Sequence, residues 1–131
     1  TFAPGWKVRD WGGPKMKPGL RKEWDGRKKV LLTHPRSKTV PCVLSRKIEV
    51  PTGKKTTLEL EVTNHPKGNW KLVVLINSVE ALSKDIEETK WQQLQIDLSK
   101  YAGKTVSIEL ENRATGWAHE AAYWHQIQIA H

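Results

Sequence analysis

Four side chains capable of ligand chemistry lie close together near the carboxyl end of the sequence. The segment Asn112–Glu120 holds a guanidinium at Arg113, an indole at Trp117, an imidazole at His119 and a carboxylate at Glu120. An indole ring stacks on the apolar C–H face of a sugar, and the three polar groups can hydrogen-bond to hydroxyls. Because loops on rigid scaffolds commonly carry binding groups, this segment is the first candidate for a ligand-binding loop.

Tryptophan is unusually frequent, with seven residues beside two Tyr and one Phe. Trp70 and Trp91 each open an apolar strand pattern, which predicts that they pack in the core. Trp11, Trp24 and Trp117 lie in glycine-rich or charged segments, where ligand stacking competes evenly with packing at the edge of the core. Trp24 therefore joins the candidate ligand-binding residues.

Two further loops carry polar groups that could join the same site. His34 and Arg36 belong to a His-Pro-Arg-Ser loop, and His65 lies in the next turn-rich segment. Ordinary turn chemistry explains these residues equally well. They can contribute to binding only if the loops meet at one end of the fold.

Catalytic signatures are absent from the sequence, so no catalytic residue is assigned. There is no Gly-x-Ser-x-Gly nucleophile motif and no phosphate-binding glycine loop. The five histidines do not form a zinc signature, which leaves metal ligands unknown. A glycosidase would need two carboxylates at a defined separation, and Glu120 meeting Glu23 or Asp25 in space stays a minor alternative.

Alternating apolar and polar residues predict an all-β fold. In 57–63, Leu58, Leu60 and Val62 fall on one face of a strand and Glu59 and Glu61 on the other. Turn signals separate further expected strands at 30–32, 40–44, 48–50, 70–76, 94–98, 106–111 and 122–129. The segment 70–76 is apolar on both faces near its end, which predicts a central position in a sheet. Short strands at this spacing favour a β-sandwich jelly roll in a single domain spanning residues 1–131.

Three segments are harder to assign from the pattern. Residues 1–27 are rich in Gly, Pro and Lys and are expected to wrap the sandwich irregularly. Residues 79–90 are expected to be extended, although they could hold a helical turn. In the last strand, strict alternation would place Trp124 with Gln126 and Gln128 on the polar face, so Trp124 is either exposed or turned inward by a β-bulge.

The order of segments resembles galactose-binding-like domains. The resemblance rests on the run 70–77, then 91–97, then 97–106 with its Ser-Lys-Tyr-Ala-Gly connection, then 107–112 and 122–129, and covers roughly the last two-thirds of the chain. It implies a jelly-roll sandwich that binds carbohydrate and serves as an accessory domain of a larger secreted or periplasmic bacterial protein. Some members carry structural calcium, but His125-Gln126 replaces an expected acidic position, so no cofactor is assigned.

The charge distribution suggests a second kind of partner. Residues 1–55 carry 15 Lys/Arg and 4 Asp/Glu, whereas residues 56–131 carry 7 and 10. A basic half can attract an acidic polysaccharide, or an acidic protein in an assembly role, although it also keeps a sandwich soluble. Nucleic acid is the weakest of these hypotheses because no recognised motif is present.

Two remaining features are the single cysteine and the absence of a membrane-spanning run, and neither settles the cellular compartment. The single cysteine, Cys42, lies in an apolar stretch and is expected to be a buried thiol. The sequence has no membrane-spanning run, and it begins at Thr1, as an excised domain or a mature product would.

Overall fold

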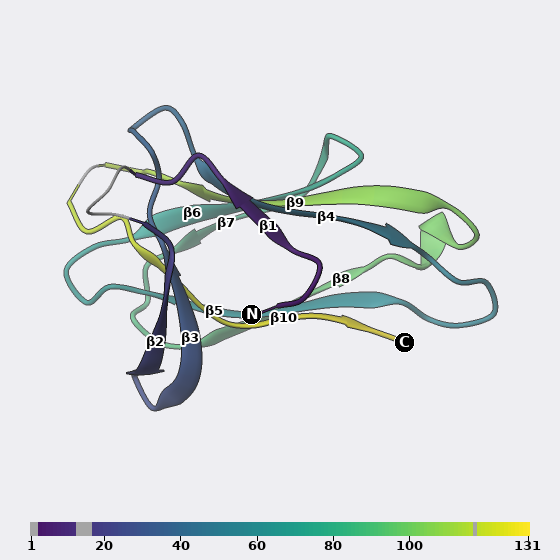
Figure 1. The fold of residues 1–131 in the computed structure, drawn as a ribbon, viewed down its shortest axis with the longest axis horizontal. Coiled ribbons are helices and arrows are strands. Elements are labelled where there is room, and N and C mark those ends of the chain that lie inside the picture. The colour runs from purple at the N-terminus through teal and green to yellow at the C-terminus, as the bar shows by residue number, and fades with distance from the viewer. Residues whose placement is uncertain (1–2, 13–16, 117) are drawn as a thin grey trace.

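The computed structural model describes residues 3–12, 17–116 and 118–131, and nearly all of its regular structure is β-strand (Figure 1). The strands are β1 (Lys7–Arg9), β2 (Gly19–Trp24), β3 (Arg27–Thr33), β4 (Cys42–Glu49), β5 (Thr57–Asn64), β6 (Trp70–Ile76), β7 (Val79–Ile86), β8 (Gln92–Asp97), β9 (Thr105–Arg113) and β10 (Ala122–Ala130). A short 3-10 helix at Ser99–Tyr101 forms the compact connection expected between β8 and β9. Within the described ranges, no helix is long and apolar enough to cross a bilayer.

The strands form two antiparallel five-stranded sheets that face each other. Sheet I has the order β1-β4-β9-β6-β7, and sheet II has the order β2-β3-β10-β5-β8. Figure 1 shows the two sheets as separate layers, with sheet I above sheet II. This arrangement confirms the predicted all-β sandwich of the jelly-roll type.

The core lies between the sheets and follows the predicted alternation. Leu58, Leu60 and Val62 of β5 are fully buried and pack with residues from both layers. Glu59 and Glu61, one position away, point from the opposite face of sheet II, because successive side chains of a strand alternate. Sheet II therefore has one apolar inner face and one polar outer face.

A β-bulge in β10 decides the position of Trp124. The register of β10 against β5 shifts between Trp124 and Gln126, so His125 is an extra residue with no partner in β5. The bulge turns Trp124 into the core, where it is fully buried beside Trp70. The inward alternative for Trp124 is thus the one observed.

A single hydroxyl group ties Trp124 to both sheets. Thr33 Oγ1 accepts hydrogen bonds from Trp124 Nε1 at 2.9 Å and from Asn112 Nδ2 at 3.0 Å. All three residues are buried. A buried N–H donor without an acceptor costs free energy of folding, so these two bonds stabilise the fold. Through them, Thr33 of β3 is joined to β9 and β10.

The amino-terminal half is more regular than the sequence predicted. Residues 1–27 were expected to be irregular, but β1 and β2 lie in this range and pair with β4 and β3. The expected strands 40–44 and 48–50 are one strand, β4, which pairs with β9 from Cys42 to Glu49. Charged residues between the apolar runs interrupt the pattern without interrupting the backbone ladder. The extended prediction for 79–90 is confirmed over Val79–Ile86 by β7.

Cys42 is buried, as expected from its apolar neighbours. Burial, together with the negative charge of Asp10, raises the pKa of its thiol to about 12. Cys42 is therefore a protonated packing residue at neutral pH and not a nucleophile.

Replacing Thr33 by Val tests the hydroxyl that joins the strands. The side chain keeps its shape, but two buried donors lose their acceptor, so the free energy of unfolding should fall by roughly 1–3 kcal/mol or more in urea denaturation. Thr105→Val, at an exposed position of β9, is the matched control. Equal stability of the two variants would show that the Thr33 bonds contribute little.

Candidate functional site

The outer face of sheet II carries a row of polar side chains from three adjacent strands. Glu61 of β5 lies opposite Gln93 of β8, and Glu59 lies opposite Gln95. On the other side of β5, Gln126 is paired with Glu61 and the bulge residue His125 lies next to it. Cross-strand neighbours on one face are close enough to interact. The pairing therefore gathers carboxylate, amide and imidazole groups on one surface.

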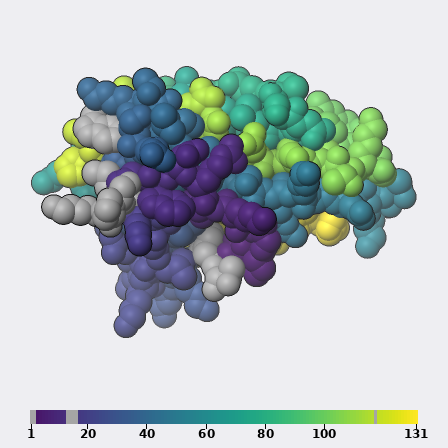
Figure 2. Space-filling view, turned by 45° about the horizontal axis from the view of Figure 1, so that its top comes forward, coloured from purple at the N-terminus to yellow at the C-terminus, as the bar shows by residue number. Residues whose placement is uncertain are grey.

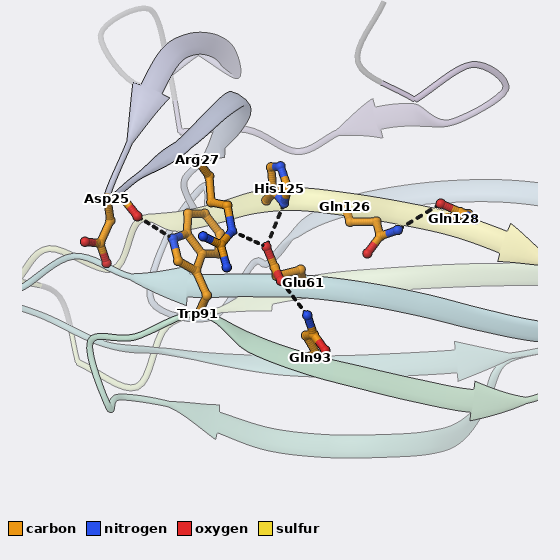
Figure 3. Close-up of polar contacts among 8 residues, drawn as sticks. All are labelled: Asp25, Arg27, Glu61, Trp91, Gln93, His125, Gln126 and Gln128. Carbon is orange, nitrogen blue, oxygen red and sulfur yellow. Dashed lines mark hydrogen bonds and ion pairs between the residues drawn. The ribbon is translucent and has the colours of Figure 1, made fainter.

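Glu61 is the centre of this row. Its carboxylate accepts hydrogen bonds from Arg27 Nε at 2.8 Å and from Gln93 Nε2 at 2.9 Å, and it contacts His125 Nδ1 at 2.6 Å (Figure 3). Only 5% of the Glu61 side chain is exposed. Burial raises the pKa of Glu61, but the bonds from Arg27, Gln93 and His125 outweigh it and hold the pKa below its usual value.

Trp91 borders this cluster just before β8. Its ring lies 5.8 Å from the Arg27 guanidinium and meets the His125 ring edge-on at 5.7 Å. Its Nε1 donates to the Asp25 carbonyl oxygen at 2.8 Å. Trp91 is only half-buried, which corrects the prediction that it packs in the core.

The β2–β3 hairpin forms a wall beside this surface. β2 lies at one edge of sheet II and β8 at the other. Asp25 lies in the turn of the hairpin, and its carbonyl oxygen accepts the hydrogen bond from Trp91, just before β8. The turn must therefore extend over the outer face of sheet II to reach Trp91. Figure 3 shows Asp25 and Arg27 approaching Trp91 from the hairpin on the same side of the sheet as His125 and Glu61.

A second group of rings lies where the hairpin meets the loops. Trp24 stacks on Tyr123 with ring centroids 4.0 Å apart and an angle of 7° between planes. His65 and His119 stack at 4.4 Å, and His65 lies 5.9 Å from Trp24. Trp24 is a strand residue and not the loop residue the sequence indicated. It remains half-buried, with part of its surface accessible.

Gly68 allows the two histidine-bearing loops to approach. A Cβ at this position would clash with the carbonyl oxygen of His119. Burial, and then the nearby His119 and Lys67, lower the pKa of His65. The amide of Lys67 donates to His65 Nδ1 at 3.0 Å, so a neutral His65 carries its proton on Nε2. That N–H is a potential donor to a ligand.

The loops predicted to cooperate do share one end of the sandwich. Ala122 of β10 pairs with both Thr33 and Asn64, which places the starts of the loops after β3 and β5 next to the loop that precedes β10. His34 contacts the carbonyl oxygen of Pro35 at 2.8 Å within the first of these loops. Exposed Arg36 lies 3.8 Å from Asp10.

The remaining predicted site residues are separated by the structure. Glu120 is buried, and its carboxylate accepts bonds from the Thr115 and Gly116 amides, so it fixes its own loop. Arg113 pairs with Glu111 at 2.5 Å on the outer side of sheet I. Trp117 lies outside the described residues. Of the predicted set, Trp24 and His119 both contact the ring of His65.

The described side chains show no cluster of metal ligands. In residues 3–12, 17–116 and 118–131, no three His, Cys, Asp or Glu residues gather where they could hold a metal ion. At the position where the resemblance led us to consider calcium, His125 contacts Glu61 and Gln126 donates to Gln128.

Solved structures with a similar sandwich fold include several carbohydrate-binding modules. TmCBM61, solved with β-1,4-galactotriose, superposes with a TM-score of 0.70 at 14% identity, over 98% of this chain and 89% of that one. The CBM22-1 xylan-binding domain of Paenibacillus barcinonensis Xyn10C gives 0.64 at 20% identity, over 95% and 84%. A CBM36 module solved with calcium and xylotriose gives 0.58 at 12% identity, over 95% and 99%. No family model and no curated protein sequence matches the chain.

The pH dependence of stability tests the Glu61 cluster. A carboxyl group whose pKa is lowered by folding stabilises the folded state above its unfolded pKa and loses this contribution as the pH falls. We expect the stability difference between wild type and Glu61→Gln to shrink as the pH falls below the ordinary glutamate pKa of 4.5. Urea denaturation across this range measures it. Glu80→Gln, at an exposed position of β7, is the control, and a pH-independent difference for Glu61→Gln would contradict the assignment.

Proposed function

We propose that this chain is a non-catalytic carbohydrate-binding domain whose ligand lies on the outer face of sheet II. The observation that carries the proposal is the pairing of two half-exposed indoles, Trp24 and Trp91, with a fixed polar row around Glu61. Sugars are recognised by aromatic surfaces combined with a few well-placed hydrogen-bonding groups. The shared fold supports the proposal, since neighbouring structures are titled as binding xylan, galactotriose or xylotriose.

The cluster suits recognition because its groups are already oriented. Glu61 holds Arg27, Gln93 and His125 before any ligand arrives. A ligand then meets donors that need little further ordering, which reduces the entropy lost on binding. The amides of Gln126 and Gln128 extend the row of hydrogen-bonding groups along β10. An elongated row of this kind suits a chain-like ligand.

Catalysis has little support at this surface. Glu120, the carboxylate considered for acid–base chemistry, is buried and bonded to amides of its own loop. Glu61 is kept ionised by its three partners, which suits a hydrogen-bond acceptor better than a proton donor. We propose that the domain has an accessory role in a larger secreted or periplasmic protein, as the resemblance to galactose-binding-like domains implies.

The loop 112–120 is a second candidate location for the same function. The loop 112–120 could bind sugar through Trp117 and His119, with Arg113 and the His34 and Arg36 loop contributing from the same end. His119 already lies against His65 near Trp24, so this loop could border the sheet II surface. Variants separate the two locations.

Substitution of the indoles tests the proposed surface. Trp91→Ala and Trp24→Ala should each weaken binding to xylan or β-1,4-galactan oligosaccharides by about tenfold, the effect of losing one aromatic contact of about 1.4 kcal/mol. Isothermal titration against this panel measures the loss. Trp91→Phe should retain more affinity than Trp91→Ala because it keeps a flat ring.

Controls distinguish location from general damage. Trp11→Ala removes a tryptophan that is 40% exposed and paired with the Pro35 loop, away from the Glu61 cluster, and should leave affinity unchanged. Thermal melting of each variant checks that it folds. Loss of affinity in Trp117→Ala alone would move the site to the loop 112–120, and unchanged affinity in both sheet II variants would exclude the proposed surface.

A further inference from the structure

A cleft of about 560 Å³ lies on the outer side of sheet I, the layer opposite the proposed sugar-binding face. Ser45 of β4 and Ser107 of β9 lie on its floor, while Lys7 of β1 and Lys47 of β4 stand beside them. The register explains the hollow, because Lys7 pairs with Ser45 and Lys47 pairs with Ser107. Small side chains thus alternate with long ones across three strands. Figure 2 shows the amino-terminal segment, in purple, lying across the molecular surface.

The cleft is strongly cationic. It is lined by Lys7, Arg9, Arg46 and Lys47, with Glu109 as its only carboxylate among the described residues. Arg9 is paired with Glu109 at 2.6 Å. No carboxylate in the described ranges lies within ion-pair distance of Lys7, Arg46 or Lys47. Lys7, Arg46 and Lys47 therefore line one hollow with no carboxylate partner in the described part of the chain.

Hydroxyl groups complete the donor set. Ser45, Ser107 and Ser78, which follows β6, all line the cleft. A serine hydroxyl can donate to an oxyanion while the ammonium and guanidinium groups balance its charge. The arrangement suits a sulfate or carboxylate group, which presents several acceptor oxygens at once.

The surroundings favour a charged sugar over nucleic acid. Among the described residues no aromatic side chain lines the cleft, so this part of the chain offers no stacking platform for bases. Its volume matches a small ligand and not an extended track for a nucleic acid backbone. Glu111, further along β9, and Glu80 on β7 place negative charge on the same sheet, which would repel a long polyanion.

We propose that this cleft is a second binding site, which takes the sulfate or carboxylate group of an acidic glycan. It does not depend on the sheet II surface, because the two faces lie on opposite layers of the sandwich. The basic excess in residues 1–55 then has a specific location, since all four cations of the cleft come from that part of the chain.

The experiment uses the full chain and a heparin-derived tetrasaccharide as the probe. Binding is measured by isothermal titration at low salt and at physiological salt, with xylotriose as a neutral comparison. The double variant Lys7→Ala/Lys47→Ala should bind the tetrasaccharide at least about tenfold more weakly, since charge-assisted contacts are lost. Lys54→Ala/Lys104→Ala removes the same charge from exposed positions outside the cleft and should bind like wild type.

Each other outcome overturns the proposal. Equal loss in both double variants would indicate general charge attraction, and no measurable binding by wild type would exclude the site. Equal or tighter binding of a short DNA duplex, with the same loss in the cleft variant, would assign the cleft to nucleic acid. Trp24→Ala and Trp91→Ala should leave tetrasaccharide binding intact, so failure of the sheet II proposal is measured separately from failure of this one.

Discussion

One extra residue in β10 determines both the core and the candidate surface. The bulge at His125 lets Trp124 point inward, where Thr33 accepts its indole hydrogen bond, and sends His125 outward onto Glu61. Without the bulge, strict alternation would expose Trp124 and place His125 in the core. The same backbone irregularity therefore fills the sandwich and builds its polar face.

Hydrogen bonds to the buried Glu61 carboxylate hold the outer face of sheet II rigid. Glu61 is almost completely covered and would be costly to bury alone, but three partners from β3, β8 and β10 surround its carboxylate. These bonds also fix the hairpin, since Arg27 follows its turn and Trp91 holds the Asp25 carbonyl. The wall and the floor of the surface are thus one connected network, whereas Lys7, Arg46 and Lys47 of the sheet I cleft have no carboxylate partner among the residues that the structure describes.

Much of the fold could be predicted because the carboxyl-terminal strands alternate with period two. The strands around Leu58 and Ile108 bury the residues that their patterns indicated. β1 and β2 could not be predicted in the same way, since short edge strands rich in Lys and Gly have no apolar face to mark them. Their conformation is set by the strands they pair with.

The candidate site was harder to predict because cross-strand register is not visible in a single sequence. Loop composition pointed to Trp117, Arg113 and Glu120, but Glu120 supports its own loop and Arg113 lies on the other sheet. Trp91 did carry a signal for the site, because this indole precedes a strand whose outer face is polar. The apolar residues that alternate with them in the same strand pointed instead to a core position. Glu61 had none, because an outward glutamate in a strand is usually a solvated residue.

The most direct test of the central claim is a nitrogen–proton NMR titration that follows the seven tryptophan indole signals as xylo- or galacto-oligosaccharide is added. Binding on the outer face of sheet II predicts saturable shifts for Trp24 and Trp91 and little change for buried Trp70 and Trp124 or for Trp11. Shifts confined to Trp117, or no saturable shift with any of these sugars, would contradict the account.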